Sequence, residues 1–222
     1  MKNKTVLFLT ALPVVVTISM LPSLPDKIPA HYNYLGEIDR WGSKYETLIL
    51  PVLIVLTGII CLILLNKLYK SALVSVDEKS SNDSKNNLKI VKILSIGTLI
   101  IFNIIQAYLI FNPLFASNGS ITFDLNMILC VAVGIILIIV GNYLPTARRN
   151  SMIGFRTKQS VTNDQLWYKA NRIAGVSSVI SGMIIIIQSF YIKGITSIMI
   201  MVAILILSSV ISAIYSYKIS KV

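Results

Sequence analysis

The chain of 222 residues is 55% hydrophobic and 13% charged, with a mean hydropathy of +0.77. In an ordinary soluble domain roughly a quarter of the residues are charged. The low charged share of this chain and its long apolar blocks exclude that class of protein. The formal net charge of +11 does not indicate nucleic-acid binding, because the basic residues lie in short segments between the apolar blocks and no nucleic-acid-binding motif is present.

Six apolar runs follow one another along the chain, and each is long enough to cross ~30 Å of hydrocarbon as a helix. They cover residues 5–21, 48–65, 93–111, 125–144, 173–192 and 195–215. The first run follows two lysines, as a signal peptide does, but it has no clear cleavage motif, so we expect it to remain as the first membrane helix. The predicted fold class is all-α: a polytopic membrane protein with six transmembrane helices.

The distribution of basic residues predicts the orientation of these spans. The N-terminus, residues 66–92, residues 145–172 and the C-terminal tail hold two, six, six and two Lys or Arg residues, whereas the three remaining loops together hold four. Because Lys and Arg are enriched in cytoplasmic loops, both termini are predicted to lie in the cytoplasm.

A polar segment divides the chain. Residues 71–89 begin with SALVSVDEKSSNDSKNN, a low-complexity sequence that predicts a flexible cytoplasmic linker. It separates a two-span N-terminal part, residues 1–70, from a four-span part, residues 90–222.

The loop of residues 23–47 is predicted to lie outside the cell. Its prolines restrict the backbone and its glycines permit turns, which indicates an ordered cap, with a hairpin that turns near Leu35 and Gly36. One hypothesis is that the cap recognises a molecule outside the cell. The candidate recognition residues are Tyr32, Tyr34, Glu37, Asp39 and Trp41. The alternative is a cap on the membrane surface that only joins two helices.

The basic segment, residues 141–175, contains six Lys or Arg residues and one acidic residue. Thr162 and Gln165 have the spacing of a capping box, which predicts a helix that starts there and runs into the fifth span. One hypothesis is that the segment contacts a cytoplasmic protein or lipid headgroups. The candidate contact residues are Arg148, Arg149, Asn150, Gly154, Arg156, Trp167, Asn171 and Arg172. The alternative is a topology anchor followed by an interfacial helix.

Polar and small residues inside the spans have two explanations. Asn103, Gln106 and Gln188 are predicted to hydrogen-bond between helices, or alternatively to line the path of a small transporter. The fourth and fifth spans each carry two glycines seven residues apart, which predicts close packing between them. No catalytic motif appears, so an enzyme is not predicted. His31 is the only histidine and the two cysteines lie in apolar runs, so neither a metal site nor a cofactor is expected.

The order of residues in the basic segment resembles the signature of the SdpI family, bacterial membrane proteins that give immunity to a secreted sporulation-delaying peptide toxin. The matching positions are Gly141-Asn142, Asn150, Ile153-Gly154-Phe155-Arg156-Thr157, Leu166-Trp167, Asn171-Arg172 and Gly175. The sequence LPDKIPAHYNYLGEIDRWGSK in the 23–47 loop resembles a domain of unknown function that commonly precedes this signature. Two positions depart from the family pattern: Lys158 stands where proline is frequent, and Asn171 where histidine is common.

This resemblance implies a six-span protein that protects against an exported antimicrobial peptide. The implied partners are membrane lipids, a secreted peptide toxin and a cytoplasmic transcriptional repressor held at the membrane. Two other functions remain open: a small transporter or permease component, and a purely structural membrane subunit.

Overall fold

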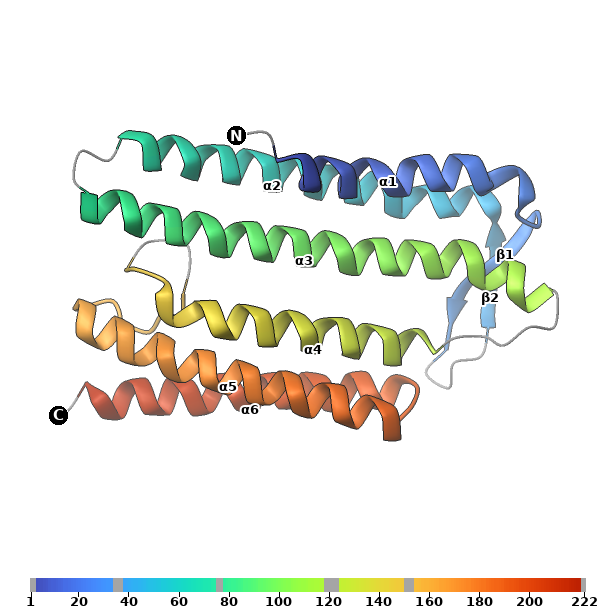
Figure 1. Cartoon of the computed structure of the whole chain (residues 1–222). Helices are drawn as coiled ribbons and strands as arrows, with labels where there is room; N and C mark the ends of the chain where they lie inside the picture. The colour runs from blue at the N-terminus through green and yellow to red at the C-terminus, as the bar shows by residue number, and fades with distance from the viewer. Residues whose placement is uncertain (1–2, 34–37, 75–77, 118–123, 150–153, 221–222) are drawn as a thin grey trace.

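Six long helices run side by side in alternating directions (Figure 1). The computed structural model describes residues 3–33, 38–74, 78–117, 124–149 and 154–220. The helices are α1 (Lys4–Met20), α2 (Ile49–Val74), α3 (Glu78–Ser117), α4 (Leu125–Tyr143), α5 (Asp164–Tyr191) and α6 (Ile195–Ile219). All six are long and apolar enough to cross a membrane, which confirms the six predicted spans.

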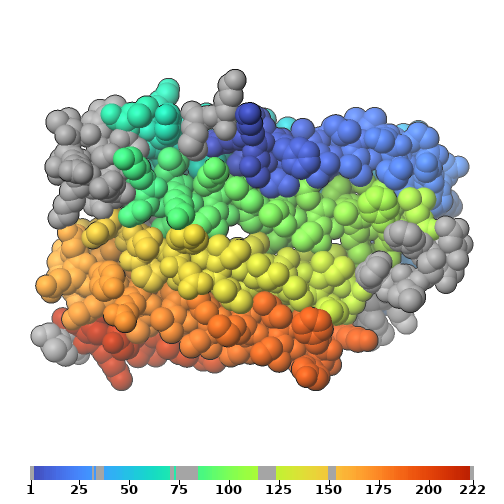
Figure 2. All heavy atoms as spheres, in the orientation of Figure 1, coloured from blue at the N-terminus to red at the C-terminus, as the bar shows by residue number. Residues whose placement is uncertain are grey.

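Large apolar side chains cover the outside of the bundle. Leu7, Ile63, Val176 and Met199, from four different helices, are each about half or more exposed. Such a surface would associate in water, and it is the surface expected where lipid tails are the solvent. Figure 2 shows the resulting elongated body, with the N-terminal three helices along one side and the C-terminal three along the other.

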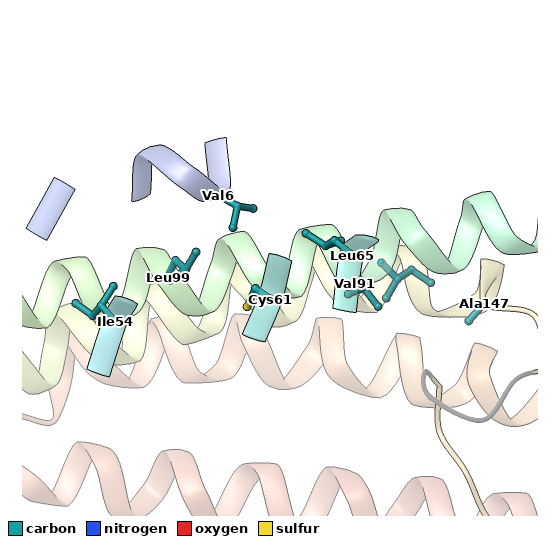
Figure 3. Close-up of a cluster of buried hydrophobic side chains, with 8 residues drawn as sticks. Val6, Ile54, Cys61, Leu65, Val91, Leu99 and Ala147 are labelled. Carbon is teal, nitrogen blue, oxygen red and sulfur yellow. The ribbon is translucent and has the colours of Figure 1, made fainter. Parts of the chain in front are cut away.

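The N-terminal three helices pack around a shared apolar cluster. Its buried members are Val6, Ile54, Cys61, Leu65, Ile90, Val91, Leu99 and Ala147, most of which are labelled in Figure 3. Ala147 belongs to the basic segment, so this cluster also contacts the start of that segment. Both cysteines are buried and free, in agreement with their predicted packing role.

Glycines bring α4 and α5 into backbone contact. A Cβ added at Gly141 would lie 2.6 Å from the carbonyl oxygen of Gly175, and one added at Gly182 would lie 2.5 Å from that of Gly134. These distances are too short for any side chain to fit without a shift of the backbone. The close packing predicted from the two glycine pairs is therefore confirmed.

The backbone differs from the linker predicted for residues 71–89. Helix α2 continues to Val74 and α3 begins at Glu78, so most of this stretch is helical. An apolar span supplies a helical nucleus at no further cost, and residues such as Lys and Glu extend it readily because propagation is far easier than nucleation. Composition alone therefore misidentified this polar extension of α3 as a flexible linker.

An antiparallel hairpin caps one end of the bundle. Strands β1 (Lys27–Tyr32) and β2 (Ile38–Ser43) pair between short 3-10 helices, η1 (Leu21–Ser23) and η2 (Lys44–Leu48). The predicted hairpin is thus confirmed, although residues 34–37, which include the predicted turn, lie outside the described residues. The basic segment and the C-terminus lie at the opposite end (Figure 1), hereafter the basic end, as distinct from the hairpin end.

Candidate functional sites at the two ends of the bundle

Ion pairs fasten the base of the hairpin. The guanidinium of Arg40 contacts both carboxylate oxygens of Glu46, at 3.3 and 2.9 Å. Glu46 also accepts a hydrogen bond from the Ser43 backbone N–H, which completes a capping box at the start of η2. Lys44 pairs with Asp26 at 2.9 Å, and its hydrogen bond lowers the pKa of the Asp26 carboxyl.

A buried glutamine joins the hairpin base to the membrane helices. The Gln106 amide, only 1% exposed, donates to the Thr47 carbonyl at 3.1 Å and to the Thr17 hydroxyl at 2.8 Å. One turn earlier in α3, Asn103 donates to the Leu9 carbonyl of α1 at 2.9 Å. These bonds tie α1, α3 and η2 together, which confirms the predicted interhelical role of both side chains.

The hairpin presents some of its predicted recognition residues to solvent. Trp41 lies on β2 opposite Pro29 and is 59% exposed. Asp39 is exposed as well, and its carboxylate lies 2.6 Å from Nδ1 of His31. Tyr32 closes β1, where it pairs with Ile38. The remaining two candidates, Tyr34 and Glu37, lie outside the described residues.

A cavity of about 290 Å³ lies beneath the hairpin. Most of its lining residues are apolar, and the Arg40–Glu46 ion pair also contributes to the lining. The lining residues are Ile28, Pro29, Ala30, Arg40, Glu46, Thr47, Ile49, Leu50, Leu53 and Leu109. Sequence analysis did not single out Arg40 or Glu46. The spacing of Ser43 and Glu46 is that of a capping box, so this signal could have identified Glu46.

At the basic end, Trp167 and Asn171 of α5 hold the preceding loop. The Trp167 indole is 2% exposed and donates to the Ala147 carbonyl at 2.7 Å. Asn171 is fully buried, accepts from the Phe155 backbone N–H at 2.7 Å and donates to the Trp167 carbonyl at 2.9 Å. Each buried polar atom in this set is therefore used to fix the course of the loop.

Gly154 allows the loop to approach this pair. Its φ of +115° is a conformation that residues with a side chain rarely adopt, and an added Cβ would lie 2.5 Å from the Trp167 ring and 2.8 Å from the Asn171 Oδ1 atom. Three of the predicted contact residues therefore face the interior of the segment. A partner cannot reach Trp167 or Asn171 unless the loop opens.

The other end of the loop is fastened to α6. The hydroxyls of Thr157 and Ser216 lie 2.7 Å apart. Ser160, fully buried, accepts from the Thr157 backbone N–H at 2.8 Å and donates toward the Phe155 carbonyl at 3.1 Å. Sequence analysis missed Ser160 and Ser216, because no spacing in the sequence relates residues on α6 to the loop.

The start of α5 differs by one residue from the prediction. Asn163, not Thr162, is the N-cap, and its side chain accepts from the Leu166 backbone N–H at 2.8 Å. The Thr162 hydroxyl instead donates to the Gln159 carbonyl at 2.7 Å. Both residue types cap helices well, so the sequence does not distinguish the two positions. The predicted run of this helix into the fifth span is confirmed.

The arginines of the basic segment are exposed. Arg148, Arg149, Arg156 and Arg172 all face solvent, whereas Asn150 lies outside the described residues. Arg149 is held in place: its Nε atom pairs with Asp164 at 2.9 Å, and its Nη1 atom donates to the carbonyls of two loop residues at 3.2 and 3.0 Å. A polar cavity of about 240 Å³ adjoins it.

A larger cavity, of about 490 Å³, lies between the two halves of the bundle. Apolar residues of α2 and α3, such as Cys61 and Leu94, line it together with hydroxyls of α5 and α6, such as Ser178 and Ser212. Gly154 and Phe155 also line it, so the loop contacts both halves. In Figure 2 small openings mark the boundary between α3 and α4, whereas α4 and α5 form a continuous surface.

Within the described residues there is no group of three or more His, Cys, Asp or Glu side chains that could hold a metal ion.

Two regions of the chain match known families, and they include the two segments described above. Residues 8–55, which contain the hairpin, match the domain of unknown function DUF1648, and residues 146–216 match the SdpI/YfhL protein family. The C-terminal part of the chain is thus similar to the SdpI/YfhL family. The chain is also 28% identical over 222 residues to the immunity protein SdpI of Bacillus subtilis (strain 168), an alignment that covers 97% of this chain and 94% of that protein. No solved structure matches this chain.

These matches agree with the resemblance noted in the sequence. With the six apolar helices, they identify a multi-pass bacterial membrane protein.

Proposed function

We propose that this protein protects its cell against a secreted peptide toxin. The observation that carries the proposal is the alignment, over nearly the full length of both chains, with a protein named for immunity. The structure adds a suitable surface, because the hairpin is fastened by ion pairs and by a buried amide and therefore keeps its shape.

The hairpin end would face outward and meet the peptide. The positive-inside rule favours this orientation, since 16 of the 20 Lys and Arg residues lie in the N-terminus, residues 66–92, residues 145–172 and the C-terminal tail. Exposed Trp41 supplies an aromatic contact, the residue type most often found at the centre of binding surfaces. The cavity beneath the hairpin would accept an apolar side chain of the peptide, and Arg40 and Glu46 would contact polar groups beside it.

Survival of a toxin-sensitive bacterium under challenge with sporulation-delaying-type peptides tests this function. We expect the full chain to protect, and protection to be lost when residues 26–44 are replaced by a Gly/Ser linker. Trp41→Ala should weaken protection, whereas Tyr191→Ala, which removes another exposed aromatic ring, should not. Failure of the inserted full chain to protect would contradict the proposal. Protection by the linker variant would show that the hairpin has no role in recognising the toxin.

We also propose that the basic end recruits a cytoplasmic regulator through exposed cations such as Arg156 and Arg172. Their charge suits an acidic surface, and the fixed loop presents Arg156 in a defined position. Reversing both charges to Glu should abolish co-purification of a repressor and leave insertion intact. Lys218→Glu, at the same end on the C-terminal helix, is the matched control. Unchanged recruitment in the double variant would rule out this surface.

The small-transporter alternative has less support. Asn103, Gln106 and Gln188 are engaged in hydrogen bonds between or within helices and line none of the three cavities described above. If solute flux across proteoliposome membranes were lost in a Gln106→Leu variant that still folds, this alternative would be supported.

A further inference from the structure

We propose that the polar cavity at the basic end binds the phosphate group of an anionic membrane lipid. The residues that line it are Pro145, Ala147, Arg148, Arg149, Asp164, Trp167 and Tyr168. This site is distinct from the hairpin and does not depend on immunity.

The cavity lies at the depth of lipid headgroups. Helix α4 ends at Tyr143 and its apolar span at Thr146, and the next span begins with α5 at Asp164. The cavity occupies the junction between these two ends. Its wall includes Trp167 and the half-exposed Tyr168, residue types that are enriched at the membrane–water interface. A lipid that diffuses in the adjacent leaflet therefore has its phosphate at the level of the opening.

Arg149 is oriented for a phosphate before any ligand arrives. Asp164 and two backbone carbonyls use its Nε and Nη1 groups. The contacts that the described residues make with Arg149 use these two groups, and the N–H groups of Nη2 would donate to the phosphate. A guanidinium held in this way loses little entropy on binding, and its planar donors match phosphate oxygens.

The charge of the cavity favours an anion, although Asp164 opposes it. Arg148 and Arg149 together outweigh the single carboxylate, and the Asp164 carboxylate is already paired with Arg149. Exposed Lys169 and Arg172 follow on α5 and add to the positive field. The described residues that line the cavity between the two halves are all uncharged, so they offer no such selectivity for an anion.

Titration of the full-length protein tests the site. Trp41→Phe leaves Trp167, in the cavity wall, as the single tryptophan, since the chain has two. Its fluorescence is followed in mixed micelles as phosphatidylglycerol, phosphatidylcholine or inorganic phosphate is added. We expect saturable binding of phosphatidylglycerol that is roughly tenfold weaker for Arg148→Gln, since losing a hydrogen bond between charged groups weakens binding by at least about this factor.

Two further variants separate a specific site from general attraction. Lys158→Gln removes the same charge from the basic segment but outside the cavity, so it should change binding by less than about twofold. Arg149→Lys retains the charge without the planar fork and should weaken binding in the same direction as Arg148→Gln. The thermal midpoint of each variant verifies that it folds.

Three results would overturn the proposal. Equal losses for Arg148→Gln and Lys158→Gln would mean that only net charge matters. Equal binding of phosphatidylcholine would mean that the cavity does not select anionic lipid. Inorganic phosphate that binds as tightly as phosphatidylglycerol would make this a site for the free anion. None of these results bears on toxin protection, so the two proposals fail separately.

Discussion

The hairpin and the basic segment use opposite arrangements of the same residue types. In the hairpin, ion pairs and a capping box hold the backbone, and Trp41 faces solvent. In the basic segment, Trp167 and Asn171 are buried and hold the backbone, and the arginines face solvent. A tryptophan is therefore exposed on the hairpin at one end of the molecule, whereas at the other end a buried tryptophan fixes the backbone.

This difference changes how the family signature is interpreted. Gly154 and Trp167 of the signature, together with Asn171 at a position where the family commonly has histidine, are the residues that fix the loop. Their direct effect is on the shape of the basic end. Any contact with a regulator or a lipid is left to the exposed cations that this shape positions.

The largest expected effect contrasts the two tryptophans. Trp167→Ala should lower the free energy of unfolding by ~3–5 kcal/mol, because it removes a large buried ring and leaves the Ala147 carbonyl unpaired. Trp41→Ala should change it by less than ~0.5 kcal/mol, as is usual for an exposed position. Denaturant unfolding of the purified protein in detergent measures both. Similar losses at the two positions would contradict the contrast drawn here.

A smaller loss is expected at Asn171. Replacement by Leu retains the volume but leaves the Phe155 N–H without its acceptor, which should cost ~1–3 kcal/mol. Proteolysis within the basic segment should also accelerate, because the loop is no longer tied to α5. Asn142→Leu is the matched control, since Asn142 is exposed and bonds only within its own helix. If both variants were cleaved at the wild-type rate, Asn171 would have no role in closing the loop.

Gln106→Leu should have a moderate effect on the hairpin end. It removes the hydrogen bonds to Thr17 and Thr47, and bonds of this kind inside membranes contribute about 0.6 kcal/mol on average and up to about 1.7 kcal/mol. Hydrogen exchange in β1 and β2 should increase while the basic segment is unaffected. Increased exchange at both ends would mean that the halves are coupled through α3.

The smallest effect is a dependence of the hairpin on acid. Lys44 lowers the pKa of Asp26, so the carboxylate stabilises the hairpin above its unfolded pKa, and this contribution is lost as the pH falls through the folded value. The protection factors of the β1 amides, which correct each exchange rate for the intrinsic rate at that pH, should therefore fall slightly as the pH is lowered through about 4 and below. Lys44→Gln should reduce that fall. The hydrogen bond with Arg40 likewise lowers the pKa of Glu46, so a residual fall in protection is expected in the variant.

Sequence reasoning predicted the spans because each depends on local composition. It also predicted the hairpin, from prolines that restrict the backbone and glycines that permit turns. The contact of α4 with α5 was predicted from glycines seven residues apart. It missed the helical extension of α3 and the exact cap of α5, where neighbouring residues have similar propensities. These two errors concern positions at which no local signal is decisive.

The sequence by itself determined that the chain has six apolar spans and a segment that matches the SdpI/YfhL family, because hydrophobic length and residue order require no knowledge of distant contacts. Only the tertiary structure decided which signature residues are buried, which cations are exposed and where the cavities lie. Those properties arise when α5 packs against the loop that precedes it and when the hairpin is tied to α3. The physical reason is that burial and hydrogen-bond partners depend on residues far apart in the chain, such as Gln106 with Thr17 and Thr157 with Ser216.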